Sequence, residues 1–370
     1  MSEGNQVYIA VIGAGGVGRH FLHQLTHLTH THPNLSLILI SRTSKSLRAT
    51  DPSPGLSLST WEADLAASKQ SPLTISQTIH FLTETHGHCI LVDNTSSPEV
   101  ANAYPEILRR GISVVTPNKK AFSSDLALWK AIQESSYRPT TPYNTRGLVY
   151  HESSVGAGLP IISTLKDLID TGDKVKKIEG VFSGTMSFLF NNFAPLEGKG
   201  GKWSAEVTKA KEAGYTEPDP RDDLNGVDVA RKLVILARIC GLEVENTDAF
   251  PVQSLIPKEL EGVGSGEEFM EKLPGYDRSM EEVKNEAEKK GKVVRFVGSI
   301  DVERKALKVG LEEFDKGHPI AGLKGSDNII SFYTERYGSN PLIVQGAGAG
   351  GAVTAMGVTA DLIKVIQRLS

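Results

Sequence analysis

One stretch of this sequence gathers an unusual number of groups capable of acid–base chemistry. Residues 213–232 read AGYTEPDPRDDLNGVDVARK and hold carboxylates followed by a lysine, at Glu217, Asp219, Asp222, Asp223, Asp228 and Lys232. The last part predicts a helix, VDVARKLVILARIC, with Asp222 or Asp223 as its N-cap. On such a helix Asp228 and Lys232 are i and i+4 and share one face. A carboxylate–ammonium pair with further carboxylates facing it suits a small zwitterion and can pass a proton to an oxygen.

The spacing alone does not establish a site, because most i, i+4 pairs of this kind are ordinary surface salt bridges. A reaction also needs groups from elsewhere, and two strand ends offer them. CILVDNTSS (89–97) predicts a strand that runs into a polar loop with Thr95, and ISVVTPNKKAF (112–122) predicts a strand that ends in Asn118, Lys119 and Lys120. Ligands of open α/β sheets bind at the carboxyl ends of strands. We therefore expect Thr95 and Lys119 near a cofactor and a reacting carbon, although a lysine at a strand end is often only solvated.

The elements that position these groups begin with a nucleotide-binding pattern. The β-rich run VYIAVI (7–12) is followed at once by GAGGVG and an amphipathic helix. Gly13, Gly15 and Gly18 have the G-x-G-x-x-G spacing, with Gly16 and Val17 between them. The first glycine permits a tight turn, the second lets a pyrophosphate approach, and the third lets helix and strand pack. The pattern predicts a Rossmann-type dinucleotide-binding domain.

The end of the second predicted strand bears on the choice of cofactor. LSLILI (35–40) is followed by Ser41, Arg42 and Thr43, with no carboxylate to hold a ribose 2′-hydroxyl. Arg42 suits a 2′-phosphate instead, because guanidinium binds phosphate bidentately. This favours NADP and leaves NAD possible; an ordinary basic loop is the alternative.

Composition excludes several classes of protein. The chain has 370 residues, a net charge of −4 and no long basic run, which argues against nucleic-acid and membrane partners. The apolar start has neither a basic n-region nor the length of a membrane span. With two cysteines no disulfide framework is possible, so we expect a cytoplasmic protein.

The second half predicts a separate α+β region with a mixed sheet. LVYHESSVGAGLPI (148–161) reads as a strand, a glycine-rich loop and a helix opened by Pro160. A later set of alternating runs, within 293–347, predicts an antiparallel or mixed sheet. Gly346, Gly348 and Gly351 repeat the glycine spacing, but only one further helix fits after them, so we expect that helix to return to the first domain.

Together these motifs resemble homoserine dehydrogenases, of the short monofunctional type found in fungi. The resemblance rests on GAGGVG, VDNTSS, TPNKKAFS, HESSVGAGLPI, FSGT and, above all, GYTEPDPRDDLNGVDVARK. It implies the NAD(P)H-dependent reversible reduction of L-aspartate 4-semialdehyde to L-homoserine, in threonine and methionine biosynthesis. The chain ends soon after the closing helix, so we expect neither the ACT regulatory domain nor the aspartate kinase of some members.

The resemblance also implies roles for individual residues. Lys232 would be the proton donor or acceptor, with Asp228 beside it, and Lys119 would lie between nicotinamide and substrate. Substrate would be bound by Glu217, Asp223, Gly214 and Thr185. Cofactor contacts would come from the glycine loop, Arg42, Thr95, Lys119 and Gly350. A monovalent cation, sodium by expectation, would be held by the loop of Glu152, Val155, Ala157 and Leu159, mostly through backbone oxygens.

The predicted organisation has three parts. Residues 1–150 and 350–370 would form the nucleotide-binding domain, 162–296 the catalytic region, and 151–161 with 297–349 a region that pairs two copies into a homodimer. Two other functions stay open. A phosphorylating semialdehyde dehydrogenase needs a cysteine nucleophile, but Cys89 and Cys240 lie within a strand and at a helix end. A non-catalytic NADP-binding or sensing protein would have the same fold without needing Lys232 and Asp228.

Overall fold

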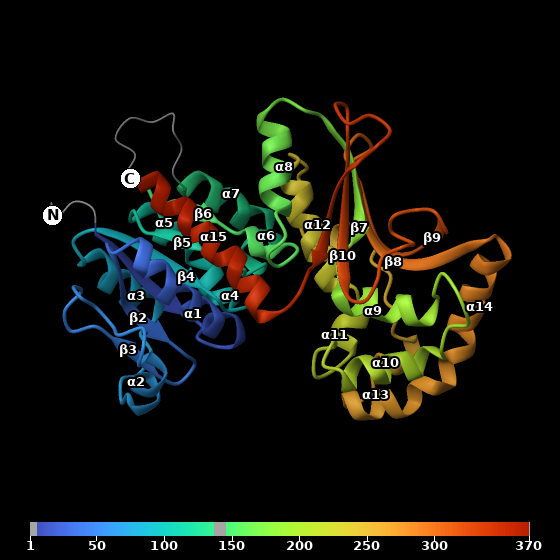
Figure 1. Ribbon diagram of the computed structural model, residues 1–370, viewed down its shortest axis with the longest axis horizontal. Helices are drawn as coiled ribbons and strands as arrows, with labels where there is room; N and C mark the ends of the chain where they lie inside the picture. The colour runs from blue at the N-terminus through green and yellow to red at the C-terminus, as the bar shows by residue number, and fades with distance from the viewer. Residues whose placement is uncertain (1–5, 137–145, 370) are drawn as a thin grey trace. The chain divides into compact units, whose positions relative to one another are not determined.

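The computed structural model describes residues 6–136 and 146–369, and contacts within it divide the chain into two compact units. The first unit comprises Met1–Pro160 and Ala349–Ser370, and the second comprises Ile161–Gly348. The chain therefore leaves the first unit once and returns to it through its last helix (Figure 1). The loop 151–160, which the sequence analysis placed with the pairing region, lies in the first unit.

The first unit is built on a sheet with the strand order β3-β2-β1-β4-β5-β6. All neighbours are parallel except β2 and β3, which form an antiparallel edge. The strands are β1 (Val7–Ile12), β2 (Leu35–Ser41), β3 (Ser46–Arg48), β4 (His88–Asp93), β5 (Ser113–Val115) and β6 (Val149–Tyr150). This is the predicted Rossmann-type arrangement, with the strand order reversing direction between β1 and β4.

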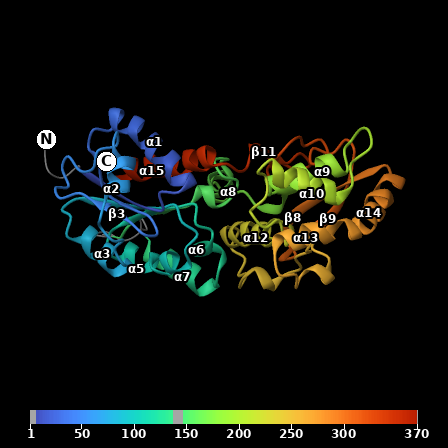
Figure 2. The same cartoon turned by 90° about the horizontal axis from the view of Figure 1, so that it is seen from below.

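Helices cover both faces of this sheet. In Figure 2, α1, α2 and α15 lie on one side and α3, α5, α6 and α7 on the other. The helices are α1 (Gly16–Thr31), α2 (Trp61–Ala67), α3 (Ile75–Thr83), α4 (Pro98–Asn102), α5 (Tyr104–Arg109), α6 (Lys120–Ser123), α7 (Leu126–Ser135), the 3₁₀ turn η2 (Glu152–Ser154) and α15 (Gly351–Leu369). Because parallel strands are buried on both faces, β1 and β2 are almost wholly apolar.

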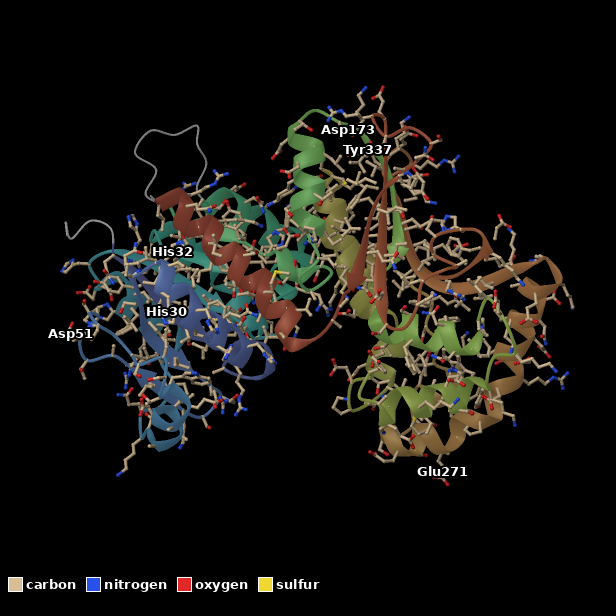
Figure 3. All side chains as sticks on the ribbon, viewed as in Figure 1. His30, His32, Asp51, Asp173, Glu271 and Tyr337 are labelled. Carbon is tan, nitrogen blue, oxygen red and sulfur yellow. The ribbon has the colours of Figure 1, made fainter. Side chains whose placement is uncertain are left out.

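The last helix completes the core of the first unit. Ala355, Val358, Leu362, Val365 and Ile366 of α15 belong to the same buried cluster as residues of β1, β2 and α1. The histidines of α1 lie outside that core, and His30 is exposed (Figure 3). No group of three or more His, Cys, Asp or Glu side chains in the described part of the chain could hold a metal ion.

The second unit has its own sheet, in the order β11-β10-β7-β8-β9. The sequence predicted an antiparallel or mixed sheet, and each pairing of these strands is antiparallel. Direct turns or short loops join β8 to β9 and β10 to β11, and such connections reverse the chain. The strands are β7 (Val175–Val181), β8 (Lys292–Asp301), β9 (Ala306–Asp315), β10 (Asp327–Thr334) and β11 (Leu342–Ala347).

Two helices pack on opposite faces of β8. Gly298 faces α12, since a Cβ there would lie 2.9 Å from Leu233 Cδ2. Arg295, an odd number of residues away, points to the other face, where it donates to Ala194 O at the end of α9. The helices of this unit are α8 (Ile161–Asp170), α9 (Gly184–Phe193), α10 (Trp203–Glu212), α11 (Arg221–Leu224), α12 (Val227–Ile239), α13 (Gly266–Lys272) and α14 (Asp277–Lys289), with 3₁₀ turns η3 (Thr247–Ala249), η4 (Lys258–Leu260) and η5 (Leu273–Tyr276).

A buried carboxylate fixes one end of this sheet. Asp173 accepts a hydrogen bond from Thr334 Oγ1 at 2.7 Å and another from the backbone N–H of Arg336 at 3.0 Å. Tyr337 follows in the same turn and lies beside Asp173 (Figure 3). No helix in the described residues is both long and apolar enough to cross a membrane.

Candidate active site

The glycine loop of the first unit is tightly packed at its ends and open in its middle. A Cβ at Gly18 would lie 2.0 Å from the carbonyl oxygen of Gly13, and Gly13 itself has a φ of +90°. A Cβ at Gly15 or Gly16 would meet nothing within 4 Å. The helix α1 begins at Gly16, so unpaired backbone N–H groups and the positive end of the helix dipole face this open space. The loop suits a pyrophosphate.

Two further predicted cofactor residues border the same loop. Arg42 Nε donates to the carbonyl oxygen of Ala14 at 2.8 Å, which holds the guanidinium against the loop. Gly350 precedes α15, and a Cβ at the next residue, Gly351, would lie 3.3 Å from the carbonyl oxygen of Gly16. The structure therefore brings together the glycine loop, Arg42 and the start of the last helix.

A buried carboxylate that the sequence analysis did not single out organises Thr95. Asp93, the last residue of β4, is fully buried. Its Oδ1 accepts from the backbone N–H of Thr95 at 2.8 Å, and its Oδ2 accepts from Tyr104 Oη at 2.5 Å and from Asn118 Nδ2 at 3.1 Å. Burial and the charge of Asp93 raise the pKa of Tyr104 well above its ordinary value, so the phenol stays a donor.

The same network reaches Lys119. Asn118 is bonded to Asp93 and also accepts from the backbone N–H of Lys120 at 3.1 Å. Lys119 lies between these two residues, as the N-cap residue of α6. Since β4 pairs with β5, Asp93 ties together the two strand ends where the sequence predicted cofactor and substrate contacts.

In the second unit, Lys232 is buried and its ammonium group is held at two points. It is 7% exposed. Its Nζ lies 2.7 Å from Asp228 Oδ2 and donates to the carbonyl oxygen of Phe182 at 2.7 Å. Both residues of the pair lie on α12, as the i, i+4 spacing predicted. The Asp228 side chain is 45% exposed, so the pair has one end in the protein and one end open to a ligand or solvent.

The turn that binds Lys232 also carries Thr185. Residues 182–185, FSGT, join β7 to α9, and Ser183 caps the helix by accepting from the backbone N–H of Met186. Thr185 Oγ1 lies 2.6 Å from the carbonyl oxygen of Tyr215 and 2.9 Å from Asp223 Oδ1. Asp223 Oδ2 accepts from the backbone N–H of Glu217 at 2.8 Å. These hydrogen bonds hold the acidic stretch, residues 215–223, against the turn of residues 182–185.

These contacts gather negative charge around Asp223. Burial raises the pKa of Asp223, and the charges of Glu217 and Asp228 add to the effect, while its hydrogen bonds act in the opposite direction. A carboxylate in this position favours a positively charged ligand group. Gly214, in the same stretch, has a φ of +73° and leaves open space beside it. The arrangement offers a carboxylate to a positively charged group and an ammonium group to an oxygen atom.

The acidic stretch differs from the prediction in one respect. The sequence predicted Asp222 or Asp223 as the N-cap of the helix that carries Lys232, but that helix begins only at Val227, after Gly226 with a φ of +74°. A separate short helix, α11, contains both aspartates. The side chain of Asp223 is therefore free of capping and turns to Thr185. Asp219 pairs with Arg221 at 2.6 Å, which explains why it stays outside the cluster.

The loop proposed to hold a cation is buried in the first unit. Glu152 is 6% exposed, its backbone N–H donates to Asp361 Oδ2 at 2.7 Å, and Lys364 Nζ lies 3.5 Å from its Oε2. The chain then turns through two consecutive residues of positive φ, Gly156 at +78° and Ala157 at +54°. The loop therefore combines a buried carboxylate with a tight turn of the backbone.

Comparison with known proteins decides the family. Residues 13–138 match the family described as homoserine dehydrogenase, NAD binding domain, and residues 160–363 match the family described as homoserine dehydrogenase. The curated homoserine dehydrogenase of Paracoccidioides brasiliensis is 58% identical, over 99% of this chain and 100% of its own length. The chain belongs to the homoserine dehydrogenase family. The sequence-based prediction of the family and of its fungal type is confirmed.

Solved structures agree with this membership. A Candida auris protein of unknown function matches with a TM-score of 0.91 and 46% identity, over 98% of this chain and 99% of that one. A hyperthermophilic archaeal homoserine dehydrogenase in complex with NADPH matches with a TM-score of 0.70 and 22% identity, over 98% of each chain. The second match shows a shared fold. The chain therefore has the dinucleotide-binding fold that its glycine loop predicted.

Proposed function

We propose that this protein catalyses the NAD(P)H-dependent, reversible reduction of L-aspartate 4-semialdehyde to L-homoserine. The observation that carries the proposal is the ammonium group of Lys232, held by Asp228 and by the Phe182 carbonyl beside the Thr185–Asp223 pair. Family membership supplies the substrate class, and the site has the charges that such a substrate requires. A non-catalytic NADP-binding protein would have no need for a buried lysine in this setting.

Each side chain of the cluster has a separate task in this proposal. The cofactor, when bound, supplies or accepts the hydride. Lys232 gives a proton to the substrate oxygen during reduction and removes it during oxidation, because an alkoxide developing there needs a nearby acid. Asp228 orients Lys232. Asp223 and Glu217 bind the substrate ammonium group, while Thr185 and Gly214 line the site. Lys119, from the first unit, would act as a second lysine on substrate and cofactor.

The preferred cofactor in this proposal is NADP. Arg42 lies at the end of β2 and is bonded to the glycine loop, and residues 41–45 contain no carboxylate that would select a free 2′-hydroxyl. The structure of an archaeal relative with NADPH supports the same choice. Gly13, Gly15, Gly16, Val17 and Gly18 would contact the pyrophosphate.

We also propose a monovalent cation at the Glu152 loop, with sodium as the expected ion. Glu152, Val155, Ala157 and Leu159 would supply its oxygens, and the cation would stabilise a loop that closes onto α15 through Asp361 and Ser153. A homodimer built on residues 297–349 and a cytoplasmic location complete the proposal.

The activity is tested by incubating the purified protein with L-homoserine and either NADP⁺ or NAD⁺ at alkaline pH. Formation of the reduced cofactor is followed at its ultraviolet absorption, with D-homoserine as the control. We expect cofactor reduction with the L isomer, faster with NADP⁺. Binding of NADP⁺ without any turnover would instead identify a sensing protein on this fold.

A further inference from the structure

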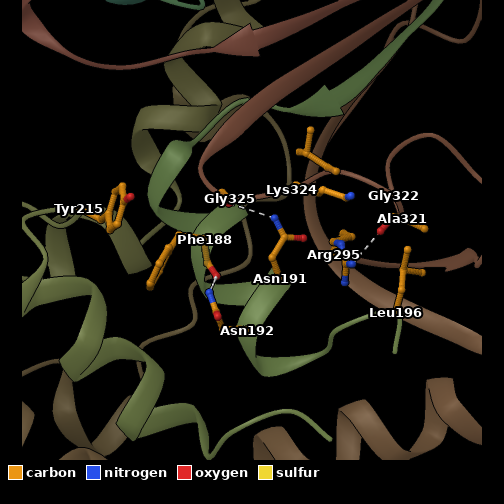
Figure 4. Close-up of a pocket in the computed structure, with 11 residues that line it drawn as sticks. Phe188, Asn191, Asn192, Leu196, Tyr215, Arg295, Ala321, Gly322, Lys324 and Gly325 are labelled. Atoms are coloured by element: carbon orange, nitrogen blue, oxygen red, sulfur yellow. Dashed lines mark hydrogen bonds between the residues drawn. The ribbon is translucent and has the colours of Figure 1, made fainter. Parts of the chain in front are cut away.

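A second cavity lies in the second unit, along α9. Its volume is about 420 Å³, which is within the range of small-molecule sites. It is formed by α9, by Tyr215, by β8 and by the segment 321–325 (Figure 4). None of the side chains assigned to homoserine lines it. The cavity is therefore a place for a different ligand.

The lining of the cavity is positively charged. It includes Arg295 and Lys324 and contains no aspartate or glutamate. Arg295 is 2% exposed, and its guanidinium donates only to backbone carbonyl oxygens, at 2.8 Å to Ala194 and 2.9 Å to Ala321. Its Nε has no hydrogen-bond partner. Within residues 6–136 and 146–369 no carboxylate pairs with Arg295 or Lys324, so the cavity holds uncompensated charge.

That charge persists at physiological pH. Burial lowers the pKa of Arg295 to about 10, which still leaves the group protonated near neutrality. The carbonyl oxygens accept from its two terminal nitrogens but do not neutralise the charge, and a buried charge is costly without a counter-ion. An anion in the cavity would offset part of this cost.

The other end of the cavity is aromatic. The rings of Phe188 and Tyr215 are stacked, with centroids 4.5 Å apart, and Tyr215 is 42% exposed. Figure 4 shows this pair on one side of the cavity and Arg295 with Lys324 on the other, with Asn191 between them. Asn191 Nδ2 donates to the carbonyl oxygen of Gly325 at 3.0 Å, which anchors the segment 321–325 to α9.

We propose that this cavity binds a small organic carboxylate that carries an apolar, planar group. The carboxylate lies between Arg295 and Lys324, and the planar group contacts the Phe188–Tyr215 pair. Guanidinium and ammonium groups bind carboxylates by charge-assisted hydrogen bonds, and offset aromatic contacts add to the burial of apolar surface.

Occupation of the cavity acts on the neighbouring active site. The carbonyl oxygen of Tyr215 accepts from Thr185, whose hydroxyl group also bonds Asp223. Phe188 lies one turn beyond Thr185 on α9. A ligand against Phe188 and Tyr215 therefore contacts both elements that hold Thr185. This regulatory effect rests on the proposed function, whereas binding of the carboxylate does not.

Binding is tested on the full-length protein by isothermal titration calorimetry, with phenylacetate as the probe and phenylacetamide as its neutral counterpart. The two molecules have the same shape and differ in charge. We expect phenylacetate to bind and phenylacetamide to bind at least about tenfold more weakly. Phenylacetate should still bind at saturating L-homoserine, with its affinity shifted by the same factor by which phenylacetate shifts the affinity for L-homoserine. Equal affinity for the two probes, or displacement by L-homoserine, would overturn the proposal.

Variants locate the bound probe. Lys324→Gln should weaken phenylacetate binding about fivefold, because an exposed charge contributes modestly. Lys316→Gln, an exposed lysine in a neighbouring segment outside the cavity, is the matched control and should bind like the parent protein. Arg295→Lys keeps the positive charge but removes the planar guanidinium group. A folded Arg295→Lys variant should bind phenylacetate more weakly than Lys324→Gln does. Unchanged affinity in Lys324→Gln would place the ligand elsewhere. Failure of the homoserine assay alone would leave these binding results unaffected.

Discussion

Replacing Asp223 by asparagine should make the protein more stable and less active. The asparagine can keep both contacts, since its Oδ1 can accept from the Glu217 N–H and its Nδ2 can donate to Thr185 Oγ1. Thr185 would still donate to the Tyr215 carbonyl, as it does now. The substitution therefore removes a charge without leaving a buried polar group unpaired.

The gain in stability should depend on pH in a defined direction. Because folding raises the pKa of Asp223 above its ordinary value of 3.8, the folded state holds this proton more tightly than the unfolded state. The carboxyl group favours folding below its ordinary pKa, and that contribution disappears as the pH rises through the raised pKa. The neutral asparagine has no such dependence. The stability of the variant relative to the parent protein should therefore increase as the pH rises from the ordinary pKa of Asp223 through its raised pKa.

The size of both effects follows from the contacts. Each kcal/mol added to the free energy of unfolding should raise the midpoint of thermal unfolding by about 2–4 °C for a unit of this size. Loss of one charge-assisted hydrogen bond to the substrate ammonium group should cost about 1.5–3 kcal/mol, which corresponds to a rise in KM for L-homoserine of about 10-fold to 150-fold. KM for the cofactor should stay within about twofold, because Asp223 lies in the second unit.

The measurements are thermal unfolding at several pH values and steady-state kinetics, with Asp222→Asn as the control. Asp222 is an exposed neighbour in the same short helix, so this variant makes the same change in charge. It should alter neither the midpoint nor KM appreciably. A lower midpoint for Asp223→Asn at pH 8, or an unchanged KM for L-homoserine, would refute the assigned environment and role of Asp223.

Four further substitutions test the remaining assignments. Lys232→Ala should lower kcat about 10²-fold to 10⁴-fold, as loss of a general acid does, with the dissociation constant of NADPH unchanged by fluorescence titration; a large loss of NADPH binding would contradict the role. Asp93→Asn should raise KM for NADP⁺ and lower kcat together by about tenfold, because each hydrogen bond to a charged group is worth about 1.5–3 kcal/mol, and a normal KM would mean that Thr95 does not depend on Asp93. Arg42→Ala should raise KM for NADP⁺ more than KM for NAD⁺, whereas equal increases would remove the basis for NADP preference. Glu152→Gln should abolish any difference in activity or midpoint between sodium chloride and choline chloride, and a difference that survives the substitution would place the cation elsewhere.

The first unit was predictable because its signals are local. The glycine loop needs close backbone approach at Gly13 and Gly18, and only glycine permits it, so the spacing alone identifies the turn. Burial of the parallel strands on both faces produces apolar runs that are easy to recognise. The division after Pro160 was less visible, because it depends on contacts between the Glu152 loop and α15, far apart in the sequence.

In the second unit, the sequence predicted contacts within one helix but not contacts between elements far apart in the chain. The i, i+4 spacing predicted the Asp228–Lys232 pair, since both residues lie on one helix. It could not distinguish a capping carboxylate from one that turns to Thr185, because the choice depends on a positive φ at Gly226 and on a turn about forty residues upstream. Asp93 was missed for a similar reason. Its partners Tyr104 and Asn118 come from different elements, and only burial shows that they meet.

The return of α15 to the first unit has a consequence for synthesis. When Pro160 leaves the ribosome, the core around β1 and α1 still lacks Val358, Leu362 and Ile366, which are made only after the whole second unit. The apolar surface of the nascent first unit therefore stays exposed while the second unit is translated. The last helix then completes both the dinucleotide-binding core and the support of the Glu152 loop in one step. The dinucleotide-binding core should therefore mature only after residues 351–369 have been translated.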